Sequence, residues 1–507
     1  MEKRLFFATS LSLLFLLIWS YLISKFYHIE NKGVVTETPT LKTSVSGEAR
    51  LPHAHIEIPA VSILPVSSEK FTLIFQESEA SLKEVSFKEY SEARFSLLRG
   101  LAIENKDWIF QKENSPSAQQ IAFVCADKDK RVVKKFSFSN SNYTIELEIS
   151  IQNLSSNSLR IRLPLVLGVL DFSGNQFEAR YQDVTLATGQ KIMHLNGRKE
   201  LRLEEVQFLA LRNRYFCAIL APDEKNHYTA FLQRINGQKT KVGLQSPELN
   251  ILPHQTISQK FRIYLGPQNL RFINAVNPDW SAAIHYGAFN LIAQLLLLIL
   301  DILYQFVHNW GIAIILLSLF IYLLLFPLTL KQMRSMKEMQ RLQPRLEELR
   351  NLYKNNPQRL NKEIMELYRE YKINPFSGCL PLIFQIPIFF ALYQVLMRCV
   401  ALKGARFLWI KDLSEPDRLF VLSYHLPLLG NEINLLPLLM LLTMFMQQKF
   451  SLRTTPGTSA QQQKLMLILF PVIFGLIFYH LPSGLVLYWF INNILMLGFQ
   501  WRMKWVI

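Results

Sequence analysis

Long uncharged apolar runs lie at the start of the chain and in its last third. They cover residues 5–23, 310–328, 376–397, 433–448 and 465–499. A bilayer core about 30 Å thick requires ~20 apolar residues in a helix, so each shorter run fits one span. The last run is too long for one span and contains the turn signal Pro482-Ser-Gly484, which predicts two helices at 465–481 and 483–499. The pattern therefore predicts six transmembrane helices.

The first run predicts a retained membrane anchor. Lys3 and Arg4 precede it, and no small-x-small cleavage site follows it, which argues against a removed signal peptide. The basic flank predicts a cytoplasmic N-terminus. We therefore expect an anchor at residues 1–27, followed by a polar linker rich in Thr and Ser at 28–54.

The segment at 284–308 is apolar enough to span, yet its interior contains Gln294, Asp301 and Gln305. Residues 331–372 carry 11 basic and 6 acidic side chains, so they should be cytoplasmic. Since the anchor leaves the chain on the periplasmic side, only one crossing fits before them, and the uncharged run 310–328 is the better span. We expect 284–308 to form an amphipathic helix along the outer interface, with a true span as the alternative. Both termini are then cytoplasmic, and residues 28–285 are periplasmic.

Residues 55–280 have the pattern of β-strands. Over 143–151, apolar and polar residues alternate strictly, so one face carries the aromatic and aliphatic side chains. The same alternation recurs at 159–163 and 261–265, and segments rich in Asn and Ser separate the strands. The pattern predicts a large antiparallel, all-β sandwich domain.

Composition supports a membrane protein. Half of the 507 residues are apolar and 19% are charged, which excludes a disordered chain and argues against a purely soluble one. The net charge of +16 fits nucleic acid, anionic lipid or topology signals beside spans, and its position favours the last. Cys125, Cys217, Cys379 and Cys399 are too scattered for a disulfide framework or a zinc site. A disulfide between Cys125 and Cys217 stays open.

The cytoplasmic segment predicts a helical hairpin outside the lipid. A basic helix continues the second span over 329–352, with Pro344 kinking or restarting it, and a second helix covers 358–371. An apolar stripe recurs along the first helix at Met333, Met336, Met339 and Leu342. The hairpin either only fixes the topology or acts as a docking lid, since methionine-rich faces adapt to varied apolar partners.

Polar side chains within the spans are costly in lipid and therefore informative. Ser318 and Tyr322 lie four residues apart and share one helix face. Other spans contain Gln385, Tyr488, Asn492 and Asn493. They either form hydrogen bonds between helices or line one hydrated cavity.

Several blocks occur in a fixed order in the C-terminal half. They are Trp310-Gly311, Phe326-Pro-Leu-Thr329, Leu342-Gln-Pro344, Asn374-Pro-Phe-Ser-Gly-Cys-Leu-Pro381, Gln385-Ile-Pro-Ile-Phe389, Ala391-Leu-Tyr393, Leu408-Trp-Ile-Lys-Asp-Leu413 and Pro482-Ser-Gly-Leu-Val-Leu-Tyr488. These blocks resemble the bacterial YidC-type membrane protein insertases of the YidC/Oxa/Alb family. Over the first 280 residues the resemblance lies in architecture rather than in motifs.

The resemblance implies a polytopic α-helical membrane protein with six transmembrane helices, a five-helix insertase core at 309–507 and the periplasmic sandwich. It implies a non-enzymatic insertase and chaperone for inner-membrane proteins, acting alone or with the Sec translocon, without cofactor or metal. The expected partners are nascent membrane proteins, the translocon, the ribosome and the phospholipid bilayer, with a monomer as the functional unit. Substrate would enter a hydrophilic groove open to cytoplasm and lipid and would dock on the methionine stripe of the hairpin.

The resemblance also implies the groove residues. They are Ser318, Tyr322, Gln385, Tyr488, Trp489 and Asn492. The chain departs from the family at Tyr322, where an arginine is typical, and at Trp489, where tyrosine is usual. Arg398 lies ~20 Å from Gln385 along the same predicted helix, so we expect it to extend to the outer membrane surface rather than to replace the missing charge.

Two other classes of function remain alternatives. A secondary transporter should have an internal repeat and a midplane ion site, and the sequence has no repeat that we can recognise. In the third reading, the periplasmic segment is a receptor module and the spans are only anchors. Solute flux in proteoliposomes would favour the transporter, and growth supported by residues 280–507 attached to the first anchor would favour the insertase.

Overall fold

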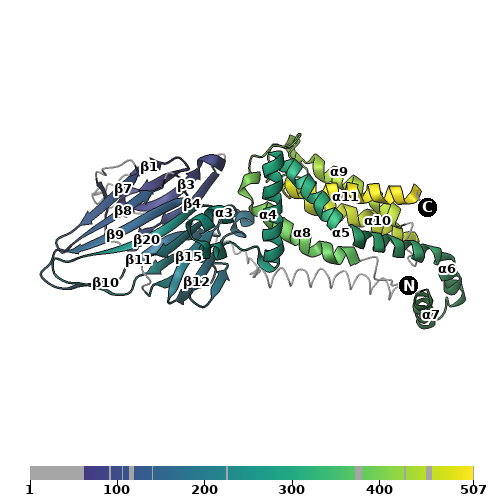
Figure 1. The fold of residues 1–507 in the computed structure, drawn as a ribbon, viewed down its shortest axis with the longest axis horizontal. Helices are drawn as coiled ribbons and strands as arrows, with labels where there is room; N and C mark the ends of the chain where they lie inside the picture. The colour runs from purple at the N-terminus through teal and green to yellow at the C-terminus, as the bar shows by residue number, and fades with distance from the viewer. Residues whose placement is uncertain are drawn as a thin grey trace, which may run out of the picture. The chain divides into compact units, whose positions relative to one another are not determined.

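The computed structural model describes residues 62–505 apart from 91–92, 106, 114–118, 140, 224–226, 372–379, 427–429 and 453–459. The described residues all belong to one compact unit within Ala60–Ile507. The predicted anchor at 1–27 and linker at 28–54 lie outside the described residues. Figure 1 shows the described chain as strands followed by helices.

The N-terminal part of the described chain consists of antiparallel sheets. In spatial order, the nine-stranded sheet contains β13 (Ile192–Leu195), β12 (Asp183–Thr188), β15 (Val206–Arg212), β16 (Phe216–Pro222), β20 (Thr256–Pro267), β9 (Thr144–Asn153), β8 (Lys130–Phe138), β7 (Gln120–Ala126) and β6 (Gln111–Glu113). The five-stranded sheet contains β14 (Leu201–Leu203), β17 (Thr229–Asn236), β18 (Lys239–Gln245), β11 (Pro164–Asp171) and β5 (Ala102–Ile103). The four-stranded sheet runs β1 (Ile63–Ser67), β2 (Phe71–Gln76), β3 (Ser81–Phe87) and β4 (Ala93–Gly100), and β10 (Leu159–Ile161) pairs with β19 (Leu249–Ile251).

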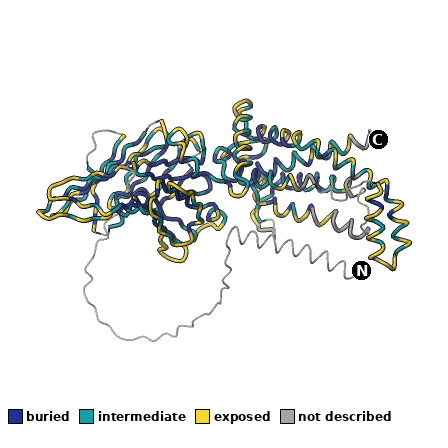
Figure 2. Tube along the Cα trace, turned by 60° about the horizontal axis from the view of Figure 1, so that its bottom comes forward, coloured by how far each residue is buried: buried dark blue, intermediate teal, exposed yellow. Residues whose placement is uncertain are grey.

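The alternation in β9 sets the buried face as predicted. Ile145, Leu147, Ile149 and Ile151 are all buried, and β9 pairs with β20 in a register that places Leu147 opposite Phe261. The inward side chains of the sheets belong to one continuous apolar cluster. Figure 2 colours the buried residues dark blue along the backbone trace. Cys125 and Cys217 are free thiols, so the open question of a disulfide between them is answered in the negative.

One buried position departs from the alternation rule. Lys134 in β8 is fully buried, and its ammonium donates to the carbonyls of Ala80, at 2.6 Å, and Leu101. Both of these residues adopt left-handed backbone conformations, which turns their carbonyls inward. Burial lowers the pKa of Lys134 to about 7.

The C-terminal part is helical. Its helices are α4 (Asn290–Val307), α5 (Trp310–Arg341), α6 (Gln343–Leu352), α7 (Pro357–Glu370), α8 (Leu380–Arg398), α9 (Leu435–Leu452), α10 (Ala460–Tyr479) and α11 (Ser483–Trp505). The short helices α2 (Gln176–Ala179) and α3 (Leu270–Val276) lie within and after the sheets. The predicted pair of helices around Pro482 is confirmed, because α10 ends and α11 begins on either side of this turn.

Three of the described helices are long and apolar enough to cross a bilayer. They include Gly287–Val307, Trp310–Met339 and Ser483–Arg502, and shorter apolar helices cover Phe384–Arg398 and Leu435–Lys449. The structure thus supports several spans, while the count of six stays a prediction. In Figure 1, α4 crosses the direction of α5 and α8, both of which it contacts.

The hairpin of residues 331–372, predicted to be cytoplasmic, has the predicted helices. Helix α5 continues through Pro327, and Pro344 lies in the first turn of α6, where its missing N–H has no cost. Asn356 caps α7 by accepting from the Arg359 N–H at 3.1 Å. Pro344 therefore starts a new helix rather than kinking the old one.

The loop after α8 holds the ends of three helices together. It contains the strands β21 (Phe420–Leu426) and β22 (Gly430–Ile433), which pair as a hairpin. The Asp417 carboxylate accepts from the N–H groups of Leu435 and Leu436 at 2.8 and 3.0 Å, which caps α9. A Cβ at Gly311 would lie 2.1 Å from the Phe407 ring, so only glycine allows this loop to pack on α5.

Candidate functional site

Gln385 and Tyr488 meet in the interior of the helical part. The amide Nε2 of Gln385, on α8, donates to the hydroxyl of Tyr488, on α11, at 2.7 Å. The Tyr488 side chain is completely buried. One turn further along α11, Asn492 Nδ2 donates to the Tyr488 carbonyl at 3.0 Å. The structure therefore connects three of the six predicted groove residues by consecutive hydrogen bonds.

The two predicted residues of α5 behave differently. Ser318 is fully buried and donates to the carbonyl of Ile314 at 2.7 Å, so its hydroxyl is satisfied within its own helix. Tyr322 is half-buried, and its hydroxyl is buried without a hydrogen-bond partner. An unpaired buried hydroxyl is costly, so Tyr322 is the α5 residue that has the most to gain from a polar partner.

Trp489 is mainly a packing residue. Its ring lies 5.0 Å from Phe389, 6.0 Å from Phe474 and 5.4 Å from Phe478, measured between centroids. This aromatic cluster joins α8, α10 and α11. The indole Nε1 is nevertheless buried without a partner, as is the amide Nδ2 of Asn493. Asn493, which is almost completely buried, was left out of the predicted groove set.

The buried side-chain atoms without a hydrogen-bond partner on the described helices thus include Tyr322 Oη, Trp489 Nε1 and Asn493 Nδ2, and Gln448 Oε1 on α9 and Gln500 Oε1 on α11 are others. Each would be satisfied by water or by a polar group of a peptide. All six predicted groove residues are uncharged, so the arrangement offers hydrogen bonds rather than an ion pair or a general base. In the part of the chain that the structure describes, no group of His, Cys, Asp or Glu has metal-binding geometry.

The predicted docking stripe on the hairpin is partly used for packing. Leu342 forms a small buried cluster with Leu346, Leu367 and Tyr368, and Met339 packs against it. Met333 is half-buried, and the side chain of Met336 lies outside the described residues. A docking role for the stripe stays a prediction.

Other apolar residues of the hairpin are exposed. Leu352 is 73% exposed and Met365 is 55% exposed, on α6 and α7 respectively. Sequence periodicity could not single them out, because both lie among charged residues at the outer side of the helices.

The prediction that Arg398 extends to the membrane surface is wrong. The residue does end α8, but its side chain is only 9% exposed, and Nη2 lies 3.5 Å from the Asp183 carboxylate of β12. A protein carboxylate therefore compensates the charge, in place of water and headgroups.

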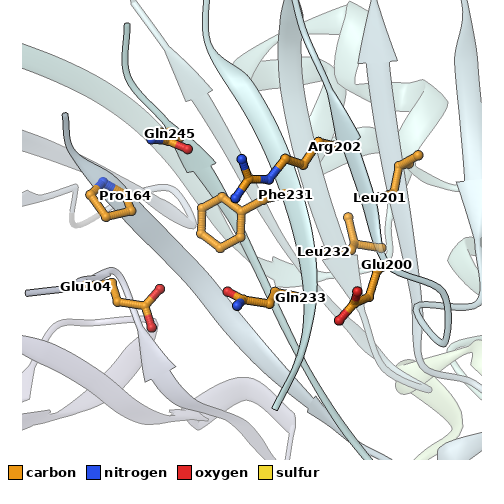
Figure 3. A pocket seen from close by; sticks show the side chains of 9 residues that line it. All are labelled: Glu104, Pro164, Glu200, Leu201, Arg202, Phe231, Leu232, Gln233 and Gln245. Carbon is orange, nitrogen blue, oxygen red and sulfur yellow. The ribbon is translucent and has the colours of Figure 1, made fainter. Parts of the chain in front are cut away.

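One pocket of about 450 Å³ lies in the sheet region, separate from the helical residues above (Figure 3). It is lined by Glu104, Pro164, Glu200, Leu201, Arg202, Phe231, Leu232, Gln233 and Gln245. Glu104 is already paired with Lys241. The pocket therefore combines one aromatic ring with polar groups and belongs to the five-stranded sheet and its edges.

Known proteins similar to this chain cover both parts of it. Residues 302–507 match the family described as 60Kd inner membrane protein, and residues 64–299 match the YidC periplasmic domain. The chain is 31% identical to a membrane protein insertase YidC of Pelobacter propionicus, over 99% of this chain and 98% of that one. It is 38% identical to the YidC insertase of Syntrophobacter fumaroxidans, over 73% of this chain and 68% of the relative.

A solved structure of an active YidC insertase is also similar. It has 19% sequence identity and a TM-score of 0.42, and the match covers 87% of this chain and 93% of the other. Both relatives named above are membrane protein insertases. The chain belongs to the YidC family of membrane protein insertases.

Proposed function

We propose that this insertase moves the polar end of a newly made membrane protein through a hydrated groove formed by α5, α8 and α11. The observation that carries the proposal is the presence of unpaired polar atoms inside the bundle, on Tyr322, Trp489 and Asn493. An interior that is dry and occupied only by protein would leave each of them without a hydrogen bond. Water in the resting state, and peptide during insertion, would satisfy them.

The energetic argument concerns desolvation. A peptide amide that leaves water without a new hydrogen bond costs ~2–7 kcal/mol, and a polar tail contains several such groups. A groove that offers water and side-chain partners partway across the bilayer removes most of that cost. The apolar segment of the substrate would then pass into lipid along α8 and α10, where it gains hydrophobic transfer energy.

Short helices would lower the barrier further. Helix α9 has 18 residues and is therefore ~27 Å long, below the ~30 Å of a typical hydrocarbon core. A span shorter than the bilayer thins it locally. Thinning beside the groove would shorten the apolar distance that a substrate has to cross.

We propose the topology from the charge pattern and from α4. Leu291, Leu295, Leu298, Ile302 and Phe306 form an exposed apolar stripe at spacings of three and four residues. Together with the crossing direction of α4, this stripe supports an interfacial helix on the periplasmic side. The proposal keeps five spans after it, plus the N-terminal anchor, with both termini in the cytoplasm.

The proposed partners follow from the same topology. The basic hairpin of residues 331–372 would meet the nascent chain first and could contact ribosomal RNA or anionic lipid. Cooperation with the Sec translocon and a chaperone role for folding substrates are part of the proposal, with a monomer as the unit.

Site-specific photo-crosslinking tests the groove. A photoreactive amino acid at Tyr322 or at Gln385 should capture a stalled nascent membrane protein in reconstituted vesicles. The matched control is Leu324, which is 62% exposed on the opposite side of α5 and should capture lipid. Failure at both groove positions would reject the proposal, and solute flux through the same vesicles would favour a transporter instead.

A further inference from the structure

Two buried arginines connect the sheets β1–β20, here called the β-domain, with the helices α4–α11, here called the helical core. Arg214 lies between β15 and β16 and is 3% exposed. Its Nε donates to the carbonyl of Met397 at 2.9 Å, and its Nη2 donates to the carbonyl of Ser414 at 3.0 Å. Met397 is in the last turn of α8, where carbonyls have no partner within the helix. Arg214 therefore caps α8 and fixes the loop that follows it.

Arg398 reaches in the opposite direction. It belongs to α8, and its guanidinium contacts the β-domain, with Nη2 3.5 Å from Asp183 Oδ2. The guanidinium also lies 5.3 Å from the ring of Tyr181, and the hydroxyls of Tyr181 and Tyr393 are 3.3 Å apart across the same junction. Each part of the protein thus places one buried arginine in the other.

The charge balance of the junction depends on Asp183. Arg212 binds this carboxylate through two nitrogens, each at 2.6 Å, and is itself completely buried. Burial by itself would raise the pKa of Asp183, but Arg212 and Arg398 outweigh it and hold the pKa below its usual value. Burial, together with the charge of Arg212, lowers the pKa of the adjacent His285 to about 3, so His285 is neutral at physiological pH. The guanidinium groups of Arg212 and Arg398 therefore share the single carboxylate of Asp183.

Arg398 lies on the same helix as the groove residue Gln385, so the junction can determine the direction of this helix. Gln385 lies ~20 Å from Arg398 on the same helix. Pro387 lies between them and removes one hydrogen bond from α8, which makes a helix easier to bend at that point. A helix with such a weak point keeps a fixed direction only if its far end is held.

We propose that Arg214 and Arg398 are positioning residues that lock the β-domain onto the periplasmic end of α8 and so hold the groove wall in place during insertion. The part of this inference that concerns insertion rests on the proposed groove. The part that concerns the lock itself depends only on the junction.

Distance measurements between spin labels test the lock in the full-length protein in lipid nanodiscs. Nitroxide-labelled residues are placed at the exposed positions of Lys128, in the β-domain, and Ile494, on α11. The native protein should give one narrow distance distribution. Arg398→Gln and Arg214→Gln should each broaden it at least twofold, whereas the control Arg406→Gln, an exposed arginine of the same loop, should leave it unchanged. A native width in both junction variants would overturn the lock.

Insertion of a small membrane protein by the same samples tests the positioning role. Arg398→Gln should lower the rate several-fold, and Arg398→Lys, which keeps the charge, should restore part of it. Broad distances with a native insertion rate would overturn the positioning role but keep the lock. Absence of any crosslink at Tyr322 in the native protein, whose distances are narrow, would instead reject the groove and leave the lock in place.

The variants should fold, because Asp183 keeps its two bonds to Arg212 when Arg398 is removed. If Arg398→Gln does not accumulate, Tyr181→Phe removes only the hydroxyl contact with Tyr393 and provides a milder test. It should broaden the distances less than Arg214→Gln does, and a native width in both would count against the lock.

Discussion

The substitution Tyr488→Phe distinguishes a hydrated bundle from a dry one. It removes one buried hydroxyl and leaves the ring in place. The amide Nε2 of Gln385, which donates to this hydroxyl at 2.7 Å, then loses its partner. What replaces the hydroxyl depends on whether water reaches this depth.

The expected magnitude differs between the two cases. In a dry interior, an unsatisfied amide N–H costs ~1–3 kcal/mol. In a hydrated groove, water takes the place of the hydroxyl, and the loss falls to the ~0.6 kcal/mol typical of hydrogen bonds between membrane helices. We predict the smaller value for the free energy of unfolding.

The free energy of unfolding is measured in bicelles for Tyr488→Phe, Gln385→Leu and the double variant. The resulting thermodynamic cycle gives the coupling energy between Gln385 and Tyr488. Tyr479→Phe is the matched control. Tyr479 is 3% exposed, and its hydroxyl donates to the Glu432 carbonyl at 2.8 Å in the packed loop after α8, so its loss should cost the larger amount. A coupling energy near 2 kcal/mol for Gln385 and Tyr488 would refute the hydrated groove.

Further predictions concern other parts of the chain. Tyr322→Phe should lower the insertion rate slightly and Tyr322→Leu more, because the hydroxyl helps to hydrate the groove; equal rates in reconstituted vesicles would remove it from the mechanism. The pKa of Lys134 is near 7 in the fold, against 10.5 ordinarily, so the unfolded chain binds an extra proton between these values. The free energy of unfolding should therefore rise with pH in that window, and Lys134→Met should flatten the rise in denaturant titrations; an unchanged slope would contradict this. Leu342→Ala should destabilise the hairpin by ~2–5 kcal/mol in hydrogen exchange. Replacing Leu352 and Met365 together by Ser should instead reduce crosslinking to the nascent chain at unchanged stability, and unchanged crosslinking would exclude them from docking.

Helix positions were predictable wherever local chemistry determines them. Trp310 begins α5 at the start of an uncharged run, and Ser483 begins α11 after the proline turn. Strict alternation likewise identified the buried face of β9. In each case the signal lies within a few residues of the element that it defines.

Contacts between distant segments were not predictable. Asp183 and Arg212 are paired by the register of β12 and β15, which alternation alone does not fix. Arg398 then joins them from a helix far along the chain, so the sequence pattern favoured the membrane surface for it. Lys134 is buried because two left-handed turns present carbonyls to it, a feature that no local pattern encodes.

Water access along residues 310–328 tests the hydrated groove most directly. Single cysteines are introduced there in a chain without its native thiols, and a charged, membrane-impermeant thiol reagent is added from the cytoplasmic side. We predict reaction at 322 and at positions on that face nearer the cytoplasm, with none at the lipid-facing positions 320 and 324. Protection of 322 together with 320 and 324 would mean that no water enters the bundle, which would contradict the proposed mechanism.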